Sequence, residues 1–154
     1  MDQLDEATAE VLRASRALLG VVARSVAPVL DRVTIPQFRV LVVLSTSDGP
    51  VRSGDLAAAL GVHPSTFTRT ADRLVASSLV RRAENPENRR ETLIELTSDG
   101  TDIVAQVTDR RQREIRSVLA RVEPGERDLV LQAMTVFARA AGEPKVRDLL
   151  ALGV

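Results

Sequence analysis

One interruption of the helical pattern limits the folds open to this chain. Over most of its length, apolar residues recur at the three- and four-residue spacing of amphipathic helices. Residues 79–83 (LVRRA) and 92–97 (TLIELT) instead alternate with the two-residue period of strands. The residues between them, 84–91 (ENPENRRE), contain Pro86 and two asparagines, which favour a turn. The pattern predicts one β-hairpin in an otherwise helical chain.

Two short helices are predicted immediately before the hairpin. Residues 53–60 and 65–77 both carry a helical pattern, and the sequence GVHP separates them. Gly61 can adopt a left-handed conformation at the corner, and Pro64 suits the first turn of the next helix. Such a corner lets one helix brace a second across DNA, although any helical hairpin can have a glycine corner. A helix–turn–helix followed directly by a hairpin is the layout of a winged helix–turn–helix.

Longer amphipathic helices are predicted on both sides of this unit. The first covers residues 4–26, and Thr34 with Pro36 marks the start of a further, largely buried helix. Two more follow the hairpin and are separated by a Pro-Gly break at 124–125. The predicted fold class is therefore mainly α with a small β-hairpin wing, a winged helix–turn–helix plus a helical dimerisation region.

The first helix and the last two carry more apolar residues than a small winged domain can bury. An isologous homodimer interface would cover them, and two recognition helices would then read a palindromic operator with half-sites about 34 Å apart. A monomer with a larger core is the alternative. The predicted organisation is an N-terminal dimerisation helix (1–33), a winged helix–turn–helix DNA-binding lobe (34–100) and C-terminal dimerisation helices (101–154).

Charge is distributed unevenly in a chain whose formal net charge is zero. Residues 61–90 contain six arginines and three acidic residues, so this segment carries +3 and the remainder −3. A local basic segment can form a phosphate-binding face, but chance clustering on a solvated surface gives the same count. The chain has three Phe and no Trp or Tyr, so it offers few platforms for stacking single-stranded bases. Double-stranded DNA is the predicted partner.

Candidate DNA contacts lie on the second helix of the pair and in the hairpin loop. Short hydroxyl side chains near a helix N-terminus suit phosphates, together with the free backbone N–H groups there. Arginines can read guanine with two hydrogen bonds, and an arginine at a hairpin tip can enter a narrow minor groove. The candidates are Ser65, Thr66, Thr68, Arg69, Arg73, Arg89 and Arg90. The alternative is that these side chains only solubilise the surface or pair with acids.

At these residues the segment 34–100 resembles the MarR family of bacterial transcription regulators. That family carries a wing motif of the form Asp-x-Arg, five residues, then Leu-Thr. Here Asn88, Arg89 and Arg90 are followed by five residues and then by Leu-Thr at 96–97. The upstream sequence LAAALGVHPSTFTRTADRLVASSLVRR is similar to the family's helix–turn–helix and first wing strand. The resemblance implies a regulator, usually a repressor, with Arg90 as the residue that reads or clamps the minor groove.

Three positions depart from the family's pattern. Asn88 replaces the usual Asp, which in the family helps to hold the wing arginines; Asn accepts hydrogen bonds but brings no charge. Ser78 stands where Gly often follows the recognition helix, and His63 stands where Ser or Thr often caps it. We interpret His63 as a turn residue or phosphate neighbour in preference to a pH sensor. The resemblance also implies a cleft for a small-molecule effector, which in this chain would be aliphatic.

Other classes of protein fit the sequence poorly. With one His, no Cys and no Gly-rich phosphate loop, the chain shows no nucleophile–base pair, so we predict no enzyme activity and no cofactor. No metal site is predicted, and no apolar run approaches the roughly 20 residues of a membrane span, so a cytoplasmic location is expected. The main alternative is a winged-helix module that binds protein without DNA. The exposed Arg69 and Arg90 favour DNA over that alternative.

Overall fold

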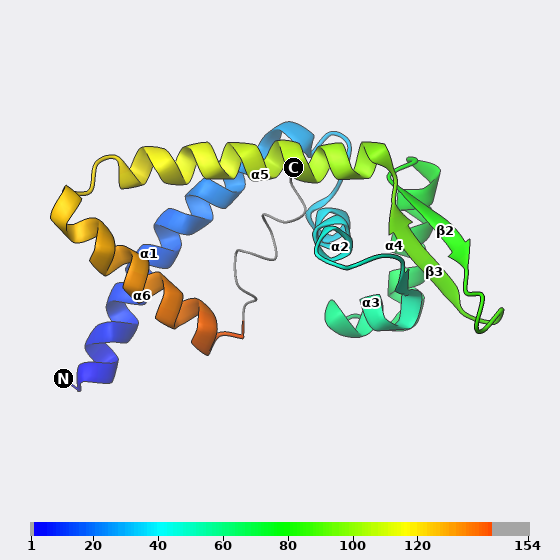
Figure 1. Cartoon of the computed structure of the whole chain (residues 1–154), viewed down its shortest axis with the longest axis horizontal. Helices are drawn as coiled ribbons and strands as arrows, with labels where there is room; N and C mark the ends of the chain where they lie inside the picture. The colour runs from blue at the N-terminus through cyan, green and yellow to red at the C-terminus, as the bar shows by residue number, and fades with distance from the viewer. Residues whose placement is uncertain (1, 143–154) are drawn as a thin grey trace.

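The computed structural model describes residues 2–142. The elements are α1 (Gln3–Val26), the 3-10 turn η1 (Ala27–Val29), α2 (Ile35–Ser45), β1 (Val51–Arg52), α3 (Ser53–Ala59), α4 (Pro64–Ala76), β2 (Val80–Glu84), β3 (Thr92–Leu96), α5 (Ser98–Leu119), the 3-10 turn η2 (Pro124–Glu126) and α6 (Arg127–Ala140). The long helix α5 connects two groups of elements (Figure 1). One group, here called the winged lobe, contains α2, α3, α4 and the sheet, and the other contains α1 and α6. The predicted fold class is confirmed.

The sheet contains a third strand that the sequence analysis did not predict. Its strands are antiparallel in the order β1–β3–β2, so β3 lies in the middle. β2 and β3 form the predicted hairpin, with Val80 opposite Leu96. β1 pairs with the other edge of β3 and places Val51 opposite Ile94. Two residues are too few to display a period, which is why β1 gives no signal in the sequence.

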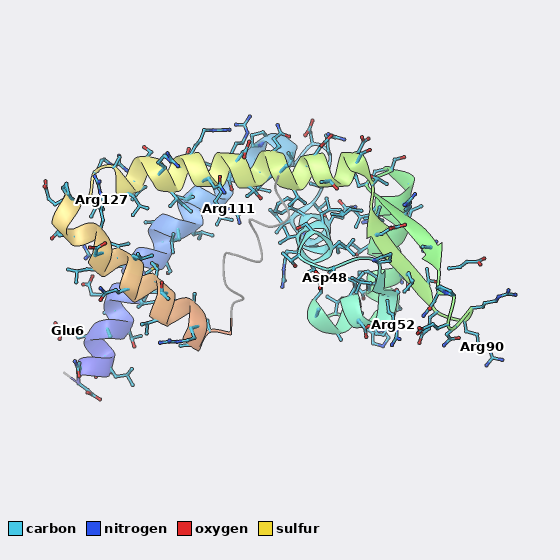
Figure 2. The ribbon with its side chains drawn as sticks, viewed as in Figure 1. Glu6, Asp48, Arg52, Arg90, Arg111 and Arg127 are labelled. Carbon is cyan, nitrogen blue, oxygen red and sulfur yellow. The ribbon has the colours of Figure 1, made fainter. Side chains whose placement is uncertain are left out.

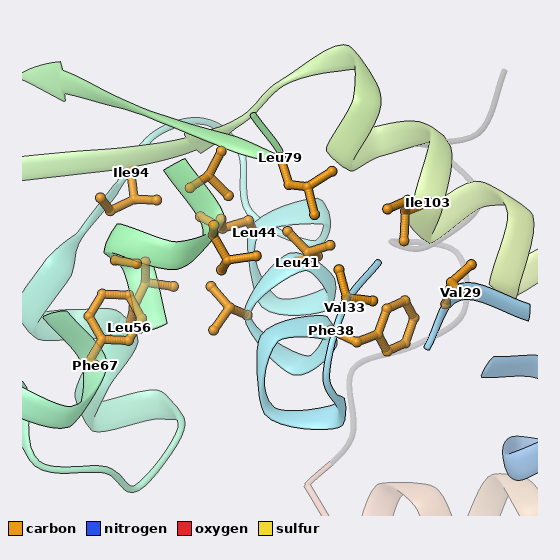
Figure 3. Close-up of a cluster of buried hydrophobic side chains, with 14 of the residues drawn as sticks. Val29, Val33, Phe38, Leu41, Leu44, Leu56, Phe67, Leu79, Ile94 and Ile103 are labelled. Atoms are coloured by element: carbon orange, nitrogen blue, oxygen red, sulfur yellow. The ribbon is translucent and has the colours of Figure 1, made fainter. Parts of the chain in front are cut away.

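The hydrophobic core lies in the winged lobe, between the sheet, α2, α4 and the first half of α5 (Figure 3). The apolar positions of α4 are predicted to be Phe67, Ala71, Leu74 and Val75; the first three are buried and Val75 is partly buried. The largest fully buried apolar side chains are Phe67, Leu41, Leu56, Leu74, Leu79, Ile94, Ile103, Val29, Val40, Val80 and Val107. Because these residues include members of α2, α3, α4, β2 and β3, helix α4 and the wing share one core.

α4 begins at the glycine corner that the sequence predicts. Gly61 has a φ of +65°, and Pro64 occupies the first turn of the helix. His63 is the N-cap: its Nδ1 accepts a hydrogen bond from the Ser65 backbone N–H at 3.3 Å and lies 2.8 Å from Ser65 Oγ. This nitrogen must be unprotonated to accept, because a protonated imidazole donates from both nitrogens. His63 therefore performs the capping role that a Ser or Thr usually performs.

Helix α4, the wing and α5 meet at one tightly packed junction. Ser78 follows α4 with a φ of 59°, a left-handed conformation that is uncommon for residues with a side chain. The Thr97 hydroxyl donates to the Ser78 carbonyl at 2.7 Å and accepts from the Gly100 N–H at 3.1 Å, which caps α5. A Cβ added to Gly100 would overlap the Leu79 carbonyl oxygen and lie 3.0 Å from Leu96 Cδ2. Only glycine lets α5 approach the sheet this closely.

α1 and α6 bury little of their surface within the single chain. Only Val21, Ser25 and Val26 of α1 are buried, and no residue of α6 is. The exposed large apolar residues on these two helices are Leu4, Val11, Leu12, Leu18, Leu19, Val22, Leu129, Leu131, Met134, Val136 and Phe137. In residues 2–142, no helix combines the length and the apolar character that crossing a bilayer requires. The predicted segment 101–154 ends in residues 143–154, which lie outside the described residues.

A polar crossing attaches α1 to the second half of α5. Arg24 Nη2 lies 2.9 Å from Glu114 Oε2, and Arg111 Nε donates to Ser25 Oγ at 3.4 Å. Figure 2 shows Arg111 on the part of α5 next to α1. Burial lowers the pKa of Arg111, because desolvation disfavours the charged guanidinium. α5 therefore packs by apolar contacts on the winged lobe and partly by polar contacts on α1.

The junction predicts a large effect of Gly100→Ala. The added methyl group must displace the Leu79 backbone, so unfolding in urea should require about 2 kcal/mol less free energy than in the wild type. Gly125→Ala is the matched control, because a Cβ there meets no atom within 4 Å. It should change the free energy by at most about 0.5 kcal/mol. Equal losses in the two variants would contradict this account.

The N-cap predicts a smaller effect at His63. His63→Ala removes the acceptor for the Ser65 N–H and should lower the free energy of unfolding by about 1 kcal/mol. His63→Ser restores a hydroxyl acceptor, so its unfolding midpoint should equal or exceed that of the wild type. The measurement is thermal unfolding followed by circular dichroism at one protein concentration. A His63→Ala protein as stable as wild type would show that the imidazole does not cap α4.

Candidate nucleic-acid interface

The solvent-facing side of α4 is polar and basic along its length. Thr66, Thr68, Arg69 and Arg73 are exposed, and Ser65 is exposed in the first turn. They face solvent because the 3.6-residue period turns the apolar positions of α4 toward the core. α4 therefore has one apolar face in the core and one polar face in solvent.

The N-terminal turn of α4 differs from the sequence expectation in one respect. The N–H groups of Ser65, Thr66 and Phe67 are not free, because the first donates to the His63 ring and the other two to the His63 carbonyl. The Thr68 hydroxyl donates to the Pro64 carbonyl at 2.9 Å. The expectation of free backbone N–H groups at these positions is therefore wrong. A phosphate at this turn would accept hydrogen bonds mainly from side-chain O–H groups.

The loop between β2 and β3, here called the wing loop, is shaped by two asparagines. Asn85 Oδ1 accepts from the Glu87 N–H at 3.0 Å, and Asn88 Oδ1 accepts from the Arg90 N–H at 3.2 Å. Bonds of this kind fix the backbone two residues onward. Asn88 therefore holds the backbone of Arg90 without the charge of the usual Asp.

Ion pairs divide the six arginines of residues 61–90 into two groups. Arg81 Nε lies 2.7 Å from Glu95 Oε1, and Arg82 pairs with Asp72, which joins β2 to α4. The other four of the six, Arg69, Arg73, Arg89 and Arg90, have no carboxylate partner among residues 2–142. Figure 2 shows Arg90 at the far end of the wing. The unpaired positive charge therefore lies on α4 and on the wing loop.

A polar cleft of about 520 Å³ lies where β1 and the start of α3 meet α4 and the wing. Thr68 lines it from α4, Arg82 from β2 and Arg90 from the wing loop. Of the candidate contacts, Thr68 and Arg90 thus share one cleft, and the other candidates do not line it. α4 and the wing loop therefore lie next to the same cleft.

The sequence analysis missed a polar group at the base of the wing. Glu91 Oε2 lies 3.2 Å from Arg52 Nε on β1 and accepts a hydrogen bond from Asn85 Nδ2 at 2.9 Å. Asn85 is buried, which is unusual for an amide in a loop. Arg52 comes from a strand that precedes α3, and only the pairing of β1 with β3 brings it to the wing.

Comparison with known proteins places this arrangement among regulators. The model of the MarR family matches residues 33–92. RV1404 from Mycobacterium tuberculosis has a similar structure, with a TM-score of 0.83 and 43% identity over 94% of this chain and 98% of that one. The HTH-type transcriptional regulator YfiV of Bacillus subtilis is 27% identical over 73% of this chain and 69% of its own length. A mutant of S. aureus MepR, solved bound to an oligodeoxyribonucleotide, shares the fold, with a TM-score of 0.65 and 19% identity over 88% and 97% of the two chains.

The matched residues 33–92 run from the start of α2 through the wing loop, so they include α4 and all four unpaired arginines. The structural similarity extends beyond them to almost the whole chain, including the long helix α5. Sequence and structure thus agree on one conclusion: the chain belongs to the MarR family of winged helix–turn–helix transcription regulators.

Proposed function

We propose that this protein binds a palindromic operator in double-stranded DNA as a homodimer and represses transcription. The observation that carries the proposal is the placement of unpaired arginines on two adjacent elements, α4 and the wing loop. A duplex presents phosphates and grooves that basic side chains on a helix and a neighbouring loop can contact together. A mutant of MepR, a protein of the same fold, was solved bound to an oligodeoxyribonucleotide, which supports DNA as the partner.

α4 is the proposed recognition helix in the major groove. Arg69 and Arg73 are one turn apart on its exposed face, and each guanidinium can donate two hydrogen bonds to guanine O6 and N7. The hydroxyls of Ser65, Thr66 and Thr68 are placed near the N-terminus, where they contact phosphates. The asparagine- and proline-containing loop leaves Arg90 free to enter the minor groove, with Arg89 on a neighbouring phosphate.

The homodimer follows from the apolar surface of α1 and α6. A helix with no buried residue in the single chain and five large apolar side chains at 43–65% exposure favours a partner surface. We assign residues 1–33 and 101–154 to dimerisation and 34–100 to DNA binding. A two-fold axis through this region would relate two copies of α4, which then read two half-sites about 34 Å apart.

A small ligand that changes the spacing of the two recognition helices would release the operator. The family resemblance supports such an effector, and no residue is assigned to it. The alternative function, a winged-helix module that binds another protein without DNA, predicts no strong dependence on salt. The two functions are therefore separated by a salt titration.

Arg90→Ala tests the wing contact. Affinity for duplex DNA from the region upstream of the protein's own gene should fall linearly with salt on a log–log plot, because bound arginines displace counterions. The variant should bind about tenfold more weakly and lose about one unit of slope for each wing that contacts DNA. Arg121→Ala removes the same charge outside the winged lobe and should match the wild type. Binding without salt dependence would favour the protein-binding module.

Phe137→Glu tests the dimer. Phe137 is 52% exposed in the single chain, and a carboxylate there cannot be buried against an apolar partner surface. The variant should elute as a monomer in size-exclusion chromatography with light scattering, at a concentration where the wild type is a dimer. Thr135→Glu, on the opposite face of α6, should remain dimeric. A monomeric wild type would refute the dimer.

A further inference from the structure

One carboxylate oxygen of Glu91 links the two ends of the wing loop and strand β1. Its Oε2 accepts a hydrogen bond from Asn85 Nδ2 at 2.9 Å and lies 3.2 Å from Arg52 Nε. Asn85 follows β2, Glu91 precedes β3, and Arg52 belongs to β1. Both ends of the wing loop and the neighbouring edge strand are therefore held by a single charged group.

Asn85 restricts the positions that this carboxylate can take. Asn85 is only 6% exposed, and both polar atoms of its side chain form hydrogen bonds within the loop. Nδ2 donates to Glu91, and Oδ1 accepts from the Glu87 N–H at 3.0 Å. A conformation in which this buried amide loses a hydrogen-bond partner is destabilised, because water cannot replace the missing bond. The burial of Asn85 thus disfavours loop conformations in which Glu91 moves away.

Backbone hydrogen bonds carry this restraint to the tip of the wing. The Asn88 N–H donates to the Asn85 carbonyl at 3.2 Å, and the Glu91 N–H donates to the Asn88 carbonyl at 2.9 Å. Arg90 precedes Glu91 directly, and its own N–H donates to Asn88 Oδ1. The position of the Arg90 backbone therefore depends on where Glu91 is anchored.

We propose that Glu91 is a positioning residue for DNA binding: through Arg52 and Asn85, it fixes the wing loop so that Arg90 is presented to the minor groove. It supplies, three positions later, the carboxylate that the wing motif lacks at Asn88. Because this carboxylate binds Arg52, it does not neutralise either wing arginine. The proposal rests on the DNA-binding function proposed above and explains how the wing is held ready for it.

Positioning and simple electrostatics predict opposite effects of neutralising Glu91. As a negative charge close to DNA, Glu91 would repel phosphates, so its removal would strengthen binding. As an anchor, it keeps the wing loop ordered before binding, so its removal would weaken binding by adding an ordering cost. Glu87 is the matched control, since it is an exposed carboxylate in the same loop with no side-chain ion pair to the described residues.

The test compares wild type, Glu91→Gln and Glu87→Gln on a fluorescent duplex that the wild type has selected from a random pool. Glu91→Gln should bind about fivefold more weakly, and Glu87→Gln should bind equally or more tightly. In an Arg90→Ala background, Glu91→Gln should have no further effect, because the anchor acts through Arg90. Hydroxyl-radical footprints of Glu91→Gln should lose minor-groove protection and keep the rest.

Hydrogen exchange of the free proteins provides a readout that does not require DNA. The amides of Asn88, Arg90 and Glu91 should exchange at least about threefold faster in Glu91→Gln than in wild type, with core amides unchanged. Unchanged exchange in the loop would overturn the proposal, as would equal weakening with and without Arg90. If the wild type selects no duplex, the DNA-binding function fails, and the exchange result alone still decides whether Glu91 holds the loop.

Discussion

The close packing of α5 on the end of α4 is the contact on which the other functional parts depend. Gly100 approaches the Leu79 carbonyl so closely that no side chain fits between them, and the Thr97 hydroxyl joins Ser78 to the first turn of α5. At this point the recognition helix ends, the first wing strand begins and the long helix starts. Loosening this contact would let the wing and α4 move relative to each other. The two elements proposed to contact DNA would then no longer have a fixed relative orientation.

The winged lobe uses its arginines in two different ways. Arg81 and Arg82 are neutralised within the fold, where they tie β2 to β3 and to α4, and Arg52 does the same for β1 and the wing loop. Such partly exposed pairs add little to stability, but they fix the relative orientation of elements that carry charge. Arg69, Arg73, Arg89 and Arg90 have no carboxylate partner among residues 2–142, which leaves four of the six arginines for the proposed contact with DNA.

The sequence was sufficient for the elements that carry a long period or a strong turn signal. The helices, the hairpin, the left-handed Gly61 and the exposed face of α4 all follow from local patterns. The features that the sequence did not predict depend on contacts between residues far apart in the chain. β1 is two residues long, and the ion pair of Arg52 with Glu91 exists only because β1 pairs with β3. The bonds of the N–H groups at the start of α4 also could not be anticipated, because His63 accepts through both its ring and its carbonyl.

The continuity of α5 has a mechanical consequence. Its 22 residues span roughly 33 Å and pack on the winged lobe at one end and on α1 at the other. With no break along its length, a tilt of about 5° at the α1 end displaces the other end by roughly 3 Å, close to the rise of one base pair. In a two-fold assembly the two displacements add or cancel according to their direction. In the proposed dimer on DNA, the separation of the two α4 helices would therefore be set by the angle of α5 at its α1 end, which lies away from the winged lobe.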